Sequence, residues 1–303
     1  MKESLRRELL GLCQTSPDQI RVVAENPECV YVAGFMPKQF LGGAIEAKID
    51  AFWNELEANE NAKGNTNFFN GGQCEFAGYT DQFTNGSAKE KKPIGINLLQ
   101  TDYKHAVASK KGNLGPELWL IGNSGAIIFR SLTGERNYVF GERNKSVQNV
   151  GGVLELPPAG YIDVHNPRIV PKDFQCGVSG YSIFDANILD EREEELGFPF
   201  EDPDDIWFGE SKKTVDVQAV GIIKIVPYHD YNVSHVIEMN TSEEEVREMF
   251  ARRPKKNELD AIHVVPESRL LAFMRERGQT LGPRAKSHFE HMIKYADVVQ
   301  QEY

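Results

Sequence analysis

The most informative stretch of the sequence consists of two pieces, LPPAGYID at residues 156–163 and DEREEELGF at residues 190–198. In the second piece, Glu191, Glu194 and Glu195 have the spacing that places them on one face of a helix. Like charges packed in this way repel each other, so either water or a cation must offset the repulsion. A hard divalent ion such as Mg²⁺ suits clustered carboxylate oxygens. A solvated helix face without an ion is the alternative reading of the same pattern.

These two pieces resemble the box of the Nudix hydrolase family, written G-x5-E-x7-R-E-U-x-E-E-x-G-U with U an aliphatic residue. Residues 194–198 fit the E-E-x-G-U end, and Glu191 falls on the glutamate of the R-E pair. Gly160 fits the first glycine, and Asp163 sits where many members carry an acid. Within this stretch, Gly197 can close the helix in a left-handed conformation.

The resemblance covers roughly residues 117–300, and it implies an α/β (α+β) fold of the α/β/α sandwich type with a mixed sheet. A Lys-Lys-Gly-Asn-Leu-Gly-Pro segment at residues 110–116 is the best linker signal in the chain. We therefore expect a Nudix-like domain at residues 116–303, preceded by a smaller α+β domain at residues 1–115. Extensions of this kind in the family support dimerisation or shape the substrate pocket, so a homodimer is implied.

The match to the box has clear departures. In the family the first glycine precedes the arginine by 14 positions, whereas Gly160 precedes Asp190, which replaces that arginine, by 30. Arg192 occupies an aliphatic position, and its charge predicts that it does not point into a core. The family arginine normally holds a box glutamate through a salt bridge, a role that Arg192 or Arg143 could take instead.

The resemblance implies Mg²⁺-dependent (or Mn²⁺-dependent) hydrolysis of the pyrophosphate bond in a nucleoside diphosphate linked to another moiety. It assigns Glu191, Glu194 and Glu195 to catalysis and to the metal, with Asp163 as a further candidate ligand. Substrate contacts are expected at Gly160 and at Arg143, whose planar guanidinium can contact a phosphate. For Arg143 the alternative is a surface charge on a hairpin. For the whole chain the alternative is a catalytically inactive Nudix-fold module that binds a partner.

The composition limits the classes of partner. The chain has 303 residues and a formal net charge of -11, and an acidic body repels phosphate backbones, so nucleic acid is a disfavoured partner. A small nucleotide brought in with its metal remains compatible with this charge. No apolar run reaches the ~18 residues of a membrane span, and the four cysteines lack CxxC spacing. We therefore expect a cytoplasmic protein with no membrane partner.

Local patterns predict several further elements. Ser16-Pro17 predicts a helix at residues 17–26, and an apolar stripe predicts another at residues 39–58. Strands are expected at residues 118–121 and 125–130. The acidic run at residues 201–205 reads as a solvated turn. The two histidines at positions 288 and 291 read as a surface pair on the last helix.

Overall fold

A computed structural model of the chain describes residues 1–62, 72–79, 93–145, 152–171, 176, 182–254 and 258–295. Its α-helices are α1 (Glu3–Leu12), α2 (Gly43–Ala62), α3 (Tyr103–Gly112), α4 (Ile183–Leu196), α5 (Pro203–Trp207), α6 (Glu243–Arg252), α7 (Glu267–Arg277) and α8 (Pro283–Tyr295). Its strands are β1 (Ile20–Glu25), β2 (Val30–Met36), β3 (Gly72–Tyr79), β4 (Ile94–Asp102), β5 (Leu120–Arg130), β6 (Arg136–Arg143), β7 (Leu154–Glu155), β8 (Ala159–Tyr161), β9 (Thr214–Ile225), β10 (Asp230–Met239) and β11 (Leu259–Pro266). Short 3-10 turns follow β9 and α7.

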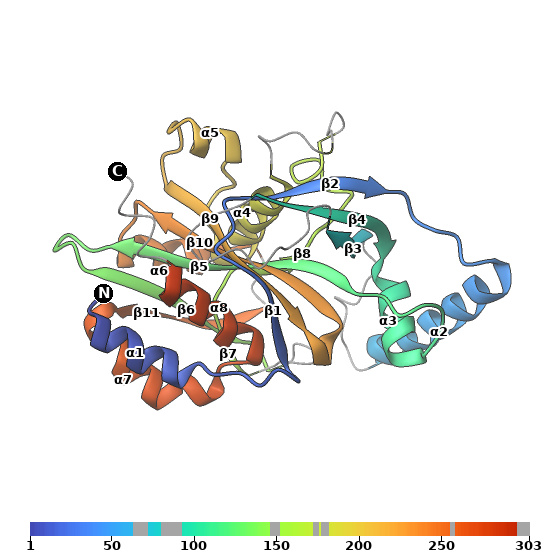
Figure 1. The fold of residues 1–303 in the computed structure, drawn as a ribbon, viewed down its shortest axis with the longest axis horizontal. Helices are drawn as coiled ribbons and strands as arrows, with labels where there is room; N and C mark the ends of the chain where they lie inside the picture. The colour runs from blue at the N-terminus through green and yellow to red at the C-terminus, as the bar shows by residue number, and fades with distance from the viewer. Residues whose placement is uncertain are drawn as a thin grey trace.

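The strands pair into one mixed sheet (Figure 1). Its main path runs β1-β9-β10-β5-β3-β4-β2, and β5 is the central strand. The β10–β5 and β2–β4 pairs are parallel, whereas the other pairs in the described chain are antiparallel. One edge of β5 carries β3, β8 and β6 in succession, because each of these strands pairs with a different part of it.

Helices cover both faces of this sheet. Alternate residues of β5 point to opposite faces, as they do in any strand. Ala126 and Ile128 belong to the core under α1, α7 and α8, while Ile127 and Phe129 belong to the core under α4 and α6. The predicted α/β class, with a mixed sheet between helices, is confirmed.

Strands from the first 115 residues belong to the same sheet as the later strands. β1 pairs with β9 along Ile20↔Ile225, and β3 meets β5 at Glu75↔Leu120. The helices α2 and α3 pack on each other at one end of the molecule (Figure 1). The division into domains at residues 1–115 and 116–303 stays a prediction.

Some local predictions were wrong, each for a reason of tertiary packing. Residues 17–26 contain β1 rather than a helix, since the β-branched run around Val22 pairs along β9. The two strands expected at 118–121 and 125–130 are the single strand β5. At Gly125, inside this strand, a Cβ would lie 2.9 Å from the Cδ of Pro158, so the absence of a side chain lets the segment before β8 pack against β5. The predicted linker begins inside α3, which ends at Asn113 in a left-handed conformation.

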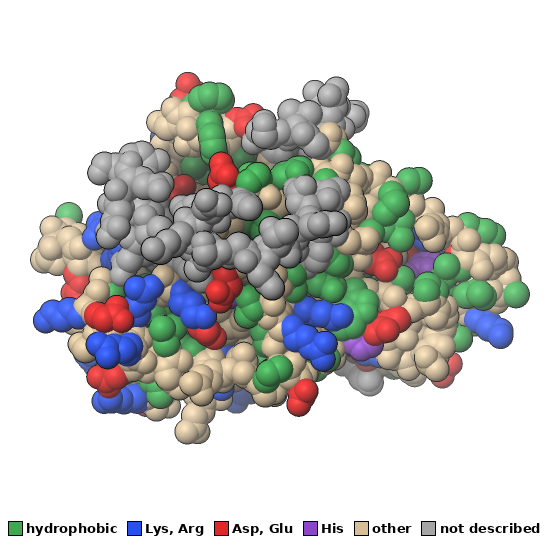
Figure 2. Space-filling view, viewed as in Figure 1, with side chains coloured by type: hydrophobic (Ala, Val, Ile, Leu, Met, Phe, Trp, Pro, Cys, Tyr) green, Lys and Arg blue, Asp and Glu red, His purple; other side chains and the backbone are tan. Residues whose placement is uncertain are grey.

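Helix capping and the distribution of surface charge follow general rules. Ser242 caps α6 by accepting a hydrogen bond from the Glu245 amide at 3.2 Å. Charges of both signs are interspersed over α1 and α7, where Arg275 pairs with Glu8 (Figure 2). Within the described ranges, no helix combines the length and the apolar character needed to cross a bilayer.

Candidate functional site

The helix α4 is held firmly at both ends. At its start, the Ser182 hydroxyl accepts a hydrogen bond from the Asp185 amide at 3.2 Å. At its end, Gly197 has a φ of 82°, as predicted, and a Cβ there would lie 2.2 Å from the carbonyl oxygen of Met249. Only glycine suits that position. Since Ile188 and Leu189 are fully buried, the orientation of the helix, and of its glutamates, is fixed.

Gly160 and Glu191 lie in direct contact. Gly160 is on β8, paired with Asn123 of β5, and α4 packs over this pair. A Cβ on Gly160 would lie 1.8 Å from Oε1 of Glu191 and 2.7 Å from its Cγ. The structure therefore brings the predicted glycine and glutamate together, and the missing side chain is what makes room for the carboxylate.

Glu195 is a buried acid with other acids around it. Its side chain is 2 % exposed. Burial raises the pKa of Glu195 well above its ordinary value, and the charges of Glu258, Glu191 and Glu155 raise it further, while Arg143 opposes them. We call Glu155, Glu191, Glu195 and Glu258 the carboxylate cluster. Such a concentration of like charge out of water is costly unless a cation or protons offset it.

Two arginines enter the carboxylate cluster. Arg143 of β6 donates to Glu155 at 2.9 Å and lies 3.8 Å from Glu258, and Arg284 of α8 donates to both oxygens of Glu155 at 2.9–3.0 Å. Burial raises the pKa of Glu155, but the two guanidinium groups outweigh it and the net shift is downward. The Arg143 side chain is 13 % exposed, so it is not an open surface charge. Its charge opposes the rise in the pKa of Glu195.

The other two predicted ligands are Glu194 and Asp163. Glu194 is a partly buried residue on α4, next to Glu195 in the chain. Asp163 lies beside β3, where its charge contributes to the raised pKa of the Cys74 thiol. Its Oδ1 accepts a hydrogen bond from the His165 amide at 2.8 Å, an arrangement typical of a turn.

The departures from the box have structural roles. Asp190 accepts hydrogen bonds from Asn166 at 2.8 Å and from Arg168 at 3.3 Å, and Arg168 also pairs with Glu193 at 2.5 Å. These contacts tie part of the long loop after β8 to α4. Asp190 therefore anchors the inserted segment at the position where the family carries arginine.

The prediction that Arg192 avoids the core was wrong. Arg192 is 0 % exposed and donates to the Pro199 carbonyl at 2.7 Å, to Glu201 at 3.2 Å and to the Thr214 hydroxyl. Glu201 also accepts from the backbone amides of residues 212–214, and hydrogen bonds and the arginine lower its pKa to about 2 despite burial. Glu201 is thus an organised counter-charge for a buried arginine, whereas Asp202, Asp204 and Asp205 are exposed, as expected of a solvated acidic run.

The histidine prediction was also wrong. His288 and His291 are almost fully buried. Nε2 of His288 lies 2.7 Å from the carbonyl oxygen of His235 on β10. Burial lowers the pKa of His288 to about 3 and that of His291 to about 4, so both rings are neutral at pH 7. They belong to the packing of α8 on the sheet.

The donor chemistry of the carboxylate cluster fits a hard divalent cation. Glu191, Glu195 and Glu258 offer carboxylate oxygens, whereas both oxygens of Glu155 accept hydrogen bonds from Arg284. Burial raises the pKa of Glu195, and the repulsion from neighbouring glutamates, which a cation would relieve, raises it further. The space beside Gly160 keeps Glu191 in the cluster. Among the described residues, no three His, Cys, Asp or Glu side chains stand close enough together to coordinate a metal ion as they are placed.

Sequence reasoning missed Glu155 and Glu258, whose charges act on Glu195, and Arg284, which donates to Glu155. They come from β7, from the residue before β11 and from α8, and only the folded chain brings them together.

Comparisons with known proteins give distant structural likenesses. No protein-family model and no curated protein matches the chain. Among solved structures, a Nudix hydrolase from Alicyclobacillus acidocaldarius is similar, with a TM-score of 0.35, 13% identity and coverage of 52% of this chain and 82% of that one. The Nudix hydrolase RenU from M. smegmatis has a TM-score of 0.32 and 10% identity over 59% of this chain and 86% of that one. DR0079 from Deinococcus radiodurans has a TM-score of 0.33 and 11% identity over 56% of this chain and 80% of that one. At these values the likeness says nothing about activity.

Proposed function

We propose that this protein hydrolyses a pyrophosphate bond, in a nucleoside diphosphate linked to another moiety, with the help of Mg²⁺ or Mn²⁺. The observation that supports the proposal is the buried Glu195 carboxyl, which faces the charges of three other glutamates and of Arg143. Perturbed carboxyl groups of this kind concentrate at functional sites. The substrate class itself comes from the resemblance of residues 156–198 to the Nudix box.

The carboxylates of the proposed site would have two roles, metal binding and proton transfer. Glu191, Glu194 and Glu195 would hold the cation, with Asp163 as a further candidate from the sequence. A divalent ion, when bound, neutralises phosphate oxygens and lowers the pKa of a water molecule. Glu258 lies outside α4 and is a carboxylate that can take a proton from that water.

Arginines complete the proposed site. Arg143 and Arg284 fix Glu155 and limit the repulsion inside the carboxylate cluster. Arg284 keeps 25% of its side chain exposed, against 13% for Arg143, so its guanidinium is the more accessible of the two to a phosphate. Gly160 acts by leaving room for Glu191.

The test is a screen of nucleoside diphosphate derivatives with Mg²⁺ and with Mn²⁺, with products separated by chromatography. Glu194→Gln should lower turnover by about 100-fold or more, a typical loss for a carboxylate that acts in the reaction. Glu193→Gln is the matched control, because Glu193 is on the same helix but pairs with Arg168. Equal activity in both variants would refute the assignment of Glu194 to the reaction.

Binding of the metal can be tested without turnover. Because the raised pKa of Glu195 favours its protonated form, Mg²⁺ should release protons when it binds. Calorimetric titrations in two buffers with different ionisation enthalpies measure this release. Glu195→Gln should abolish it, and a buffer-independent heat in the wild type would count against the metal site.

A second candidate is a module of the same fold that binds a nucleotide without cleaving it. Two observations favour it: Asp190 anchors a loop instead of carrying the family's arginine, and no triad of metal-binding side chains converges in the described residues. In that case nucleotides should raise the melting temperature without being consumed. Mg²⁺-dependent product formation would eliminate this candidate. The homodimer and the cytoplasmic location stay predictions.

A further inference from the structure

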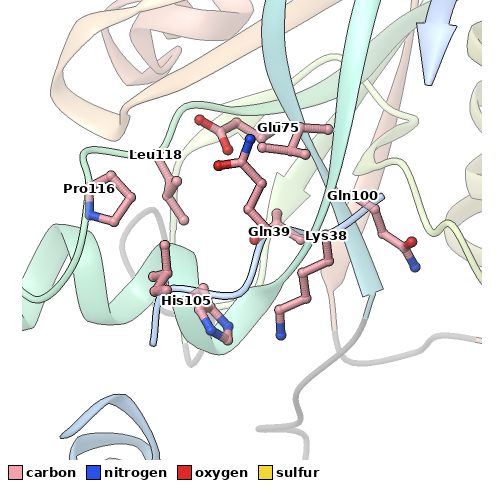
Figure 3. Close-up of a pocket in the computed structure, with 10 residues that line it drawn as sticks. Lys38, Gln39, Glu75, Gln100, His105, Pro116 and Leu118 are labelled. Atoms are coloured by element: carbon pink, nitrogen blue, oxygen red, sulfur yellow. The ribbon is translucent and has the colours of Figure 1, made fainter. Parts of the chain in front are cut away.

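A pocket of mixed polar and apolar lining lies at the end of the sheet near α3, apart from the carboxylate cluster (Figure 3). It has a volume of about 140 Å³. Its walls come from the segment after β2, from β3, β4 and α3, and from the segment before β5. Leu41, Leu99, Pro116 and Leu118 make part of the lining apolar.

Most of the charged groups at this pocket already neutralise each other. His105 lies between two acids, with Nε2 2.8 Å from Glu46 and Nδ1 in contact with Asp102. Lys38 pairs with Asp102 at 2.7 Å. Although burial opposes both effects, these contacts raise the pKa of His105 and lower that of Asp102. Two cations therefore balance two anions, and an anionic ligand finds no free positive charge here.

Glu75 is the exception. It is half-buried on β3, opposite Leu99 of β4, and in Figure 3 its carboxylate lies near the Gln39 side chain, with Leu118 and Pro116 alongside. Burial raises the pKa of Glu75 to about 7, and only a hydrogen bond from the Trp119 backbone opposes this shift. Among the residues that the structure describes, no cation pairs with this carboxylate. A buried carboxyl without a counter-charge is costly to keep ionised.

We propose that this pocket binds a small organic ammonium ion, with Glu75 as its counter-ion and the leucines around it as contacts for a short apolar body. The size agrees, since a cavity of about 150 Å³ holds one benzene molecule. The partner groups agree as well, because an ammonium donates hydrogen bonds to carboxylate and to amide oxygens, which Glu75 and Gln39 supply. The proposal involves none of the residues of the carboxylate cluster, and it stands or falls independently of hydrolysis.

The experiment uses three probes of similar shape and different charge: n-butylammonium, n-butanol and butyrate. Binding to the full-length protein is followed by NMR of carbon-13 in the glutamate carboxyl groups. We expect n-butylammonium to shift the Glu75 signal in a saturable manner and to lower its pKa from about 7. We expect n-butanol to bind at least about tenfold more weakly, a difference of 1.4 kcal/mol, and butyrate not to compete.

Two variants test the role of the carboxylate. Glu75→Gln should lower the affinity for n-butylammonium by about tenfold or more, since it removes the counter-ion and keeps the shape. Glu55→Gln, an exposed residue on α2, removes the same charge outside the pocket and should change nothing. Melting temperatures of both variants check the fold. Equal binding of butanol or butyrate, unchanged affinity in Glu75→Gln, or no binding of n-butylammonium to the wild type would overturn the proposal.

Discussion

The contact between Gly160 and Glu191 gives a prediction that can be worked out in detail. In Gly160→Ala the new Cβ would lie 1.8 Å from Oε1 of Glu191, about 1.6 Å short of ordinary van der Waals contact at 3.4 Å. The Cγ of Glu191, at 2.7 Å, is also too close, so a shift of the carboxylate alone is not enough. Glu191 must take another rotamer and leave its place in the carboxylate cluster.

We expect Gly160→Ala to lower the free energy of unfolding by about 1–2 kcal/mol, the usual cost of overpacking a site that can partly relax. The measurement is urea unfolding followed by circular dichroism. Gly11→Ala is the control, since a Cβ at this position in α1 meets no atom within 4 Å. This change should raise the free energy of unfolding by about 0.5–1 kcal/mol.

A double-mutant cycle tests the reasoning itself. If the clash with Glu191 is the cause, Gly160→Ala should cost about 1 kcal/mol less in a Glu191→Ala background than in the wild type. An equal cost in both backgrounds would show that the backbone of β8, and not the glutamate, resists the new side chain. That result would refute the account of Gly160 given above.

Three further predictions concern stability. Arg192→Met should lower the free energy of unfolding in urea by about 3 kcal/mol, because it leaves Glu201 without its buried partner. Arg247→Met, at an exposed pair, should lower it by at most about 0.5 kcal/mol. Gly197→Ala should lower the free energy of unfolding by about 2–3 kcal/mol, since it forces a left-handed alanine against Met249. A loss smaller than that of Arg247→Met would contradict this account of Gly197. The folded-state pKa of Glu201 is about 2, below its ordinary 4.5, so its contribution is complete above pH 4.5 and is lost as the pH falls towards 2. Unfolding measured between pH 7 and pH 2 should show a smaller acid loss in Glu201→Gln than in the wild type.

The sequence predicted features whose causes are local. The acidic helix and its end at Gly197 follow from spacing and from backbone chemistry within a few residues. The α/β class was implied by the resemblance to the Nudix family. Local signals of this kind hold where tertiary pairing does not override them, as it does at residues 17–26.

Features that depend on distant partners escaped prediction. Arg192 appeared unsuited to a core because nothing in its neighbourhood revealed that Glu201 would accept its charge together with three backbone amides. Residues 17–26 appeared helical because Ser16-Pro17 is a typical helix start, and nothing nearby in the sequence showed that β1 would pair with β9, about 200 residues later. The neighbours of Glu195 come from three separate elements, so spacing in the sequence carries no sign of them.

The pairing of β1 with β9 also determines when this protein can fold during its synthesis. Ile20 leaves the ribosome early, but its partner Ile225 is made about 200 residues later. At about 5–20 residues per second, β1 stays unpaired for some 10–40 seconds. During that interval β1 lacks its partner strand, and completion of the sheet waits for the segment that contains β9.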